Sequence, residues 1–135
     1  MTNAKITMQE SHTREELFQN TVNHFNSNNR SVFYTDENTP KCKFRLGEKG
    51  CTIGRELTDE LANKLDDINC GSVYDQEVFI LLPDRLRMMK KEYLKSIQIL
   101  HDTKSYWDES GLTSEGKYSA NTIINLYKLN IQLYV

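Results

Sequence analysis

The chain has 135 residues, of which 38% are hydrophobic and 27% charged, and its formal net charge is −2 at pH 7. This length suits one domain with its own hydrophobic core, and the nearly balanced charge argues against a general binder of nucleic acid or anionic membranes. Three cysteines cannot close a disulfide framework, and neither a signal peptide nor a membrane-spanning run is evident. We therefore expect a soluble, cytoplasmic protein with no membrane partner.

The N-terminal part of the chain predicts a leader and a first helix. Residues 1–12 show no sustained period and are expected to form a flexible leader to one globular domain over residues 13–135. Thr13 followed by Glu16 matches a capping box, which predicts the start of a helix. Its apolar face would consist of Leu17, Phe18, Val22 and Phe25. The Asn- and Ser-rich residues 26–29 would end it.

A β-hairpin is expected next. Residues 32–34 predict a short strand, and from 41 to 46 basic and apolar side chains alternate strictly. Strict alternation is typical of a strand with one buried and one exposed face. Gly47 and Gly50 would bracket a turn, and residues 51–53 would return as the second strand of the hairpin.

Two further helical segments are expected in the middle of the chain. Thr58 would cap a short helix. Its buried edge would consist of Leu57, Leu61 and Leu65. The apolar residues 78–82 are compatible with a buried strand or with a core helical turn. Asp84 would cap the longest helix, which ends near Asp102 and carries a core stripe of Leu86, Met89, Tyr93, Ile97 and Leu100.

A last helix would start at Thr113 or Ser114, beyond the single tryptophan, Trp107. Its inner face is expected to consist of Ala120, Ile123, Ile124, Tyr127 and Ile131. With about four helices and one small β-hairpin packed on them, the predicted fold class is mostly helical α+β.

Cysteine and histidine supply the candidates for chemistry. Cys42 and Cys51 are most simply two small buried thiols, with a metal pair or a redox pair as the alternatives. A tetrahedral zinc site from Cys42, Cys51, Cys70 and His101 is a further alternative, but the separations differ from common zinc motifs. His101 next to Asp102 could act in catalysis, whereas a structural histidine at a helix end is the simpler interpretation. We expect no metal and no cofactor.

Charge is distributed unevenly along the chain. Between residues 41 and 55 five basic residues stand against one acidic residue, whereas residues 56–77 hold seven acidic residues and one lysine. The five basic residues are Lys41, Lys43, Arg45, Lys49 and Arg55. The first three would share the exposed strand face, and Arg55 could join them in a site for a phosphate, a nucleotide or an acidic protein surface. The competing interpretation is a solvated face that only prevents edge-to-edge aggregation.

Several of these features together resemble a known pattern. Cys42-Lys43-Phe44-Arg45, a glycine turn and Cys51-Thr52-Ile53-Gly54 are similar to the signature of a widespread family of small uncharacterised phage and prophage proteins. That family typically continues with an apolar segment, matched by residues 78–82, and a helix end, matched by residues 97–102. The resemblance covers residues 13–110 and departs at residues 58–70, which lack the family's usual proline. It implies a phage origin and a place in the host cytoplasm.

The favoured hypothesis is a phage accessory protein that binds a host protein, as an inhibitor or modulator of, for example, a defence system, and not by catalysis. A binding module for a nucleotide or nucleic acid through the basic strand face is the alternative, with Tyr or Trp stacking on bases. A small enzyme centred on His101 and Cys51 ranks third, because the chain carries no familiar catalytic motif.

Overall fold

The computed structural model describes residues 9–29, 32–36, 39–42, 45–46, 49–68 and 75–133, and the side chains of residues 32–50 and 68 are outside this description. Within these ranges lie four helices of at least ten residues: α1 (Arg14–His24), α2 (Asp59–Ile68), α5 (Lys91–Asp102) and α6 (Ser114–Tyr127). The shorter helical pieces are α3 (Gln76–Phe79), α4 (Asp84–Arg87) and the 3₁₀ turns η1 (Gly54–Glu56) and η2 (Lys104–Tyr106).

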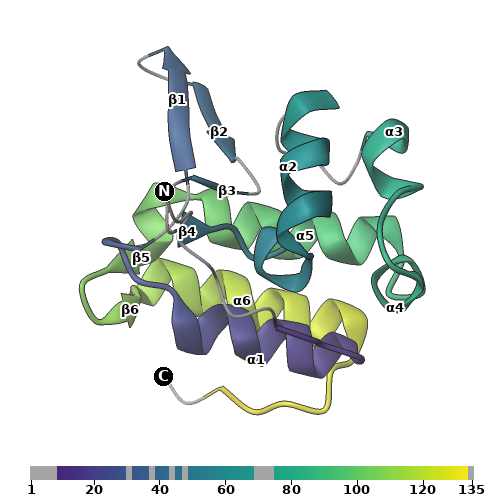
Figure 1. Cartoon of the computed structure of the whole chain (residues 1–135). Helices are drawn as coiled ribbons and strands as arrows, with labels where there is room; N and C mark the ends of the chain where they lie inside the picture. Colours follow the sequence, from purple (N-terminus) through teal and green to yellow (C-terminus); the bar gives the residue numbers. More distant parts are fainter. Residues whose placement is uncertain are drawn as a thin grey trace.

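Short antiparallel strand pairs accompany the helices. In chain order they are β1 (Val32–Asp36) with β2 (Thr39–Cys42), β3 (Arg45–Leu46) with β4 (Lys49–Gly50), and β5 (Trp107–Asp108) with β6 (Gly111–Leu112). Figure 1 shows α1, α5 and α6 side by side in one helical body, from which β1 and β2 project. The predicted fold class, mostly helical α+β, is confirmed.

Local sequence explains where α1 and α6 begin. At the start of α1, the Thr13 hydroxyl accepts a hydrogen bond from the Glu16 amide at 3.0 Å, and the Glu16 carboxylate accepts one from the His12 amide at 2.9 Å. At the start of α6, the Thr113 hydroxyl accepts from the Gly116 amide at 3.1 Å. These contacts satisfy backbone donors that have no partner inside the helix, so both predicted starts are confirmed.

The predicted apolar faces of the helices meet in one core. Its members from the predicted faces are Leu17, Phe18, Phe25, Leu57, Leu65, Leu86, Met89, Tyr93, Ile97, Leu100, Ala120, Ile123 and Ile124. Each large apolar side chain buried in this way contributes about 1.5–3 kcal/mol relative to an exposed one. Ile131, expected on the inner face of the last helix, lies beyond its end at Tyr127 but still packs against the core. The periodicity therefore identified the core correctly.

The predicted longest helix, from Asp84 to Asp102, is wrong in its continuity. It is divided into α4 and α5, and Lys90 between them has a positive φ of 81°. Arg14 provides the physical reason, because its Nε and Nη2 atoms donate to the Met89 carbonyl oxygen at 2.9 and 2.7 Å. The Met89 carbonyl therefore accepts hydrogen bonds from a side chain of α1 and not from a backbone amide of the next helical turn. Asp84 also does not cap through its side chain, because Pro83 occupies the N-cap position.

The predicted hairpin is also wrong in its strands. β2 ends at Cys42 and β3 starts only at Arg45, so residues 41–46 are not one strand. β2 pairs instead with β1, which confirms the expected strand at residues 32–34. The supposed return strand, residues 51–53, is a turn, because the Arg55 amide donates to the Cys51 carbonyl at 2.9 Å. Strands of only two residues form few hydrogen bonds with each other. The backbone after β4 therefore forms its next hydrogen bond within a helical turn and not with a strand.

Two further expectations are decided by tertiary contacts. Residues 9–12 of the expected leader are packed onto the domain: the Gln9 amide donates to the Arg55 carbonyl at 2.7 Å, and Ser11 is fully buried. The apolar residues 78–82 take the helical alternative, as the end of α3 and the turn after it. α2 starts after Thr58 as predicted, and the Thr58 hydroxyl accepts from the Leu61 amide at 3.2 Å.

Candidate functional site

The predicted basic residues are divided between the strands and the interior. Lys41 lies in β2, Arg45 in β3 and Lys49 in β4. Because β3 pairs with β4, the backbones of Arg45 and Lys49 lie close to each other. Lys43 lies outside the described residues. The strands thus bring part of the predicted set together, at the level of the backbone.

Arg55 was expected on the same exposed face, and this expectation is wrong. Only 8% of the residue is exposed, in the middle of η1. The central carbon of its guanidinium group lies 5.7 Å from the centroid of the Phe25 ring, within the range of cation–π attraction. Burial lowers the pKa of Arg55 from its ordinary value, and the neighbouring Glu56 acts in the opposite direction. The helical turn at residues 51–55 directs this side chain into the protein.

Phe25 is the centre of an aromatic cluster around Arg55. The ring centroids of His24 and His101 lie 4.7 and 4.6 Å from that of Phe25, and the centroid of Trp107 lies 6.3 Å away, all edge to face. The Trp107 indole donates to the Leu100 carbonyl at 2.9 Å, which fixes its orientation. We call Phe25, His24, His101, Trp107 and Arg55 the Phe25 cluster.

The two histidines of this cluster have different surroundings. The pKa of His24 is lowered to about 4 by burial and by the positive potential of Arg55 and His101. His101 is fully buried, and its Nδ1 atom lies 2.6 Å from a carboxylate oxygen of Asp102. Its packing against Phe25 agrees with the expected structural histidine. His24 is not among the residues that the sequence pattern predicted for the site, although it lies one residue before Phe25, a predicted core residue.

The predicted thiol and metal residues are only partly described. Cys51 is fully buried, and its sulfur accepts from the Gly54 amide at 3.2 Å. The side chain of Cys42 and the whole of Cys70 lie outside the described residues, so the Cys₃His zinc site stays a prediction. Within the described ranges, no group of three or more His, Cys, Asp or Glu side chains could hold a metal ion.

A second buried polar cluster lies around Glu56, which the sequence did not single out. The Glu56 carboxylate accepts from the Ser11 amide at 2.8 Å and from the Ser11 hydroxyl at 2.7 Å. Arg85 Nη1 lies 2.6 Å from the same carboxylate and 3.0 Å from the Ser11 carbonyl. The side-chain amide of Asn20 donates to the Ser11 hydroxyl at 2.7 Å. We call this the Glu56 cluster. It joins residues far apart in the sequence and stabilises the fold.

A hollow of about 460 Å³ lies next to this cluster, between the start of α1 and the end of α4. Two of its lining side chains are Arg14 and Arg85. Both guanidinium groups are already engaged, Arg14 by the Met89 carbonyl and Arg85 by Glu56. Arg14 also lies 5.0 and 5.3 Å from the ring centroids of Tyr93 and Tyr127. These arginines therefore act in packing.

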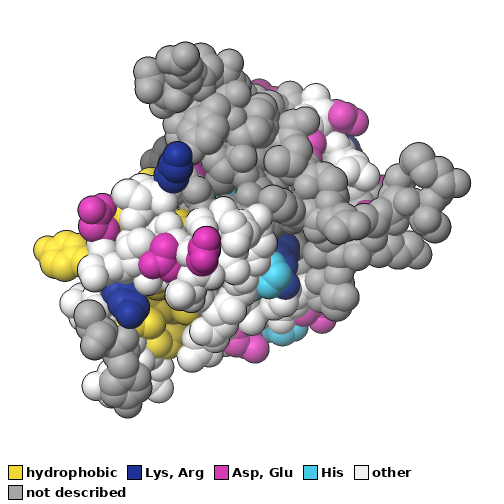
Figure 2. Space-filling view, turned by 90° about the vertical axis from the view of Figure 1, so that its left-hand side faces the viewer, with side chains coloured by type: hydrophobic (Ala, Val, Ile, Leu, Met, Phe, Trp, Pro, Cys, Tyr) yellow, Lys and Arg dark blue, Asp and Glu magenta, His cyan; other side chains and the backbone are white. Residues whose placement is uncertain are grey.

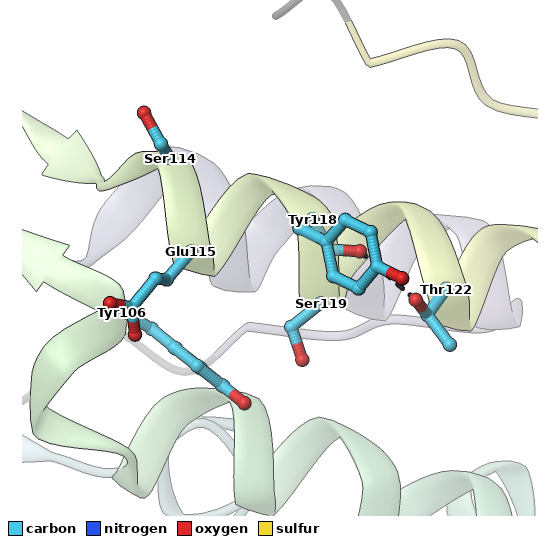
Figure 3. Close-up of a pocket in the computed structure, with 6 residues that line it drawn as sticks. All are labelled: Tyr106, Ser114, Glu115, Tyr118, Ser119 and Thr122. Carbon is cyan, nitrogen blue, oxygen red and sulfur yellow. Dashed lines mark hydrogen bonds between the residues drawn. The ribbon is translucent and has the colours of Figure 1, made fainter.

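A larger hollow, of about 620 Å³, lies on the outer side of α6. Its lining consists of Tyr106, Ser114, Glu115, Tyr118, Ser119 and Thr122. Figure 3 shows Tyr106 and Ser119 pointing into the space below α6, while Tyr118 projects outward. Tyr106 approaches α6 so closely that a Cβ atom on Gly116 would lie 2.3 Å from its carbonyl oxygen, which only glycine avoids.

The outer face of α6 also carries exposed apolar side chains. Tyr118 is 77% exposed and Leu126 is 67% exposed. With Thr122 between them, they are spaced four residues apart, so they lie along one line of the helix. Sequence analysis assigned only the inner face of this helix. The spacing of Tyr118 and Leu126 was a signal for a second, outward apolar line.

No described helix is long and apolar enough to cross a membrane. Comparison of the chain with protein-family models, with curated proteins and with solved structures finds no match.

Proposed function

We propose that the protein acts by binding another protein through the outer face of α6. The observation that carries the proposal is the exposure of two large apolar side chains, Tyr118 and Leu126, on one line of a helix next to a hollow. Exposed apolar patches beside a recess are typical of interaction sites, and tyrosine is enriched among the residues that dominate binding energy.

The lining of the hollow supports a partner of particular chemistry. It supplies hydroxyl groups and one carboxylate, that of Glu115, but no basic side chain. A negative charge among aromatic rings attracts a lysine or arginine side chain by ion pairing and by cation–π contact. The partner surface is therefore expected to present an apolar side chain for Tyr118 and Leu126 next to a basic one for Glu115.

The resemblance to small phage and prophage proteins supports a host protein as this partner, met in the host cytoplasm. Binding would inhibit or modulate the host protein without a chemical reaction. The alternative is recognition of a nucleotide or nucleic acid by the basic residues on the strands. That alternative is supported by the positions of Lys41, Arg45 and Lys49 on neighbouring strand pairs.

Capture of the partner from a host lysate, with wild type and matched variants, tests the proposal. The variant with Tyr118→Ser and Leu126→Ser should lose the partner, and its melting temperature should stay within a few degrees of wild type because both side chains are exposed. The control variant carries Ile80→Ser and Met88→Ser, which are 53% and 77% exposed on other segments, and should keep the partner.

A photo-crosslinking residue at position 118 should also label the partner, whereas one at position 80 should not. If the α6 variant keeps the partner and a variant with Lys43→Glu and Arg45→Glu loses it, the α6 face is the wrong site. Binding would then depend on the basic strands and should weaken steeply with salt.

A further inference from the structure

We propose that Arg55 and His24 form a binding site for a phosphate-type oxyanion where the end of α1 meets η1. The geometry starts from Arg55, which is more than nine-tenths buried and carries a permanent positive charge. Its guanidinium group makes no hydrogen bond or ion pair with any residue that the structure describes, and its contact there is the face of Phe25. A buried charge of this kind normally has a hydrogen-bonded counter-ion.

The other two partly buried arginines that the structure describes both have hydrogen-bond partners. Arg85 is held by Glu56 and by the Ser11 carbonyl, and Arg14 makes two hydrogen bonds to the Met89 carbonyl. Glu56, the carboxylate closest to Arg55 in the sequence, is turned toward Ser11 and Arg85. Among the arginine side chains that the structure describes, Arg55 is therefore the one whose guanidinium donors have no hydrogen-bond partner within the described ranges, and these donors suit a planar or tetrahedral oxyanion.

His24 supplies a second group at the same place that can donate a hydrogen bond to an anion and can take up a proton. Its ring packs on the edge of Phe25, the ring that also carries Arg55. Among the described residues, the titratable and charged groups that face it are Arg55 from η1 and His101 from α5, and Asp102 is hydrogen-bonded to His101. Figure 2 shows that histidine and basic side chains are both exposed on this face of the molecule.

Hydrogen-bonding capacity favours phosphate over a carboxylate. A phosphate group offers more oxygen atoms than a carboxylate, so it can accept from the Arg55 guanidinium group and from the His24 ring at the same time. In the absence of an anion, Arg55 disfavours the protonation of His24. A bound anion offsets this effect, so binding of phosphate and uptake of a proton by His24 are coupled.

Titration of the histidine rings by NMR, with inorganic phosphate and with chloride at matched ionic strength, tests the site. Phosphate should raise the pKa of His24 by about one unit or more, which corresponds to about tenfold tighter binding to the protonated form. His12, exposed at the start of α1, is the internal control and should not move. The His24→Gln variant assigns the signal. No shift at His24, or equal shifts at both histidines, would overturn the proposal.

Variants separate the site from general anion effects. In Arg55→Gln the phosphate-dependent shift of His24 should disappear, and a shift that persists in the folded variant contradicts the site. If this variant does not fold, His24→Gln decides the matter: phosphate should raise its melting temperature no more at pH 5 than at pH 8. An undiminished pH dependence would overturn the proposal. The same titration with adenosine monophosphate shows whether the site binds a free phosphate ion or the phosphate group of a nucleotide. A rise in the pKa of His24 with either probe supports the site.

Discussion

Arg55 and Glu56 are consecutive in the chain and both are almost fully buried, yet they belong to clusters of opposite character. Glu56 accepts hydrogen bonds from Ser11 and forms an ion pair with Arg85 at 2.6 Å. Arg55 rests on the aromatic face of Phe25 and, among described residues, has no carboxylate partner. A paired buried charge is explained by the fold itself, because its desolvation is offset inside the protein. For Arg55, whose contact among the described residues is an aromatic ring, the proposed oxyanion would take the place of such a partner.

The largest effect is expected when the Glu56 cluster is broken. Glu56→Ala should lower the free energy of unfolding by about 3–5 kcal/mol, because it leaves Arg85, whose side chain is only 15% exposed, without its counter-ion. Urea unfolding followed by circular dichroism measures the change. A loss below about 1 kcal/mol would remove the distinction between the two clusters.

Removal of the serine from the same cluster should have an intermediate effect. Ser11→Ala deletes the hydroxyl that donates to Glu56 and accepts from Asn20, with an expected loss of about 1–2 kcal/mol. The same unfolding experiment measures it. Ser114→Ala, at an exposed position of α6, is the matched control and should stay within about 0.5 kcal/mol of wild type.

The corresponding change in the Phe25 cluster should cost little in stability. Arg55→Met keeps an unbranched chain against Phe25 and removes a buried charge, so the free energy of unfolding should change by less than about 1 kcal/mol in either direction. The measurement is urea unfolding in chloride without phosphate. A loss as large as that of Glu56→Ala would show that Arg55 is structural.

The smallest expected effect is the pH dependence due to His24, because this residue is exposed and solvent screens the interactions that lower its pKa. Its pKa is about 4 in the folded protein against an ordinary value of 6.5, so the unfolded chain binds the proton more readily between these values. The contribution of His24 to stability should therefore be constant above pH 7, decrease as the pH falls below 6.5 and level off below 4. Melting temperatures in phosphate-free buffer should show a shallower decrease for His24→Gln than for wild type. His12→Gln is the control, and equal slopes for all three proteins contradict this assignment.

Much of the helical frame could be predicted from local sequence. Thr13 and Thr113 mark the starts of α1 and α6, and the apolar stripe of α5 lies in the core as expected. These features depend on side chains that interact with their own backbone or recur with the helical period, so a linear pattern is enough to find them. The predicted apolar stripe is buried on both sides of the break at Lys90, because α4 and α5 pack against the same core.

Tertiary structure alone decided the positions of the individual charges. Arg14 breaks the long helix by binding the carbonyl of Met89, and Arg85 reaches back to Glu56 and Ser11. Arg55 appeared to belong to a basic surface stretch, but one helical turn places it in the interior on Phe25. A sequence shows that a residue is charged but not which group lies within hydrogen-bond distance of it. That distance decides whether a buried charge is neutralised by the fold or is available to a ligand.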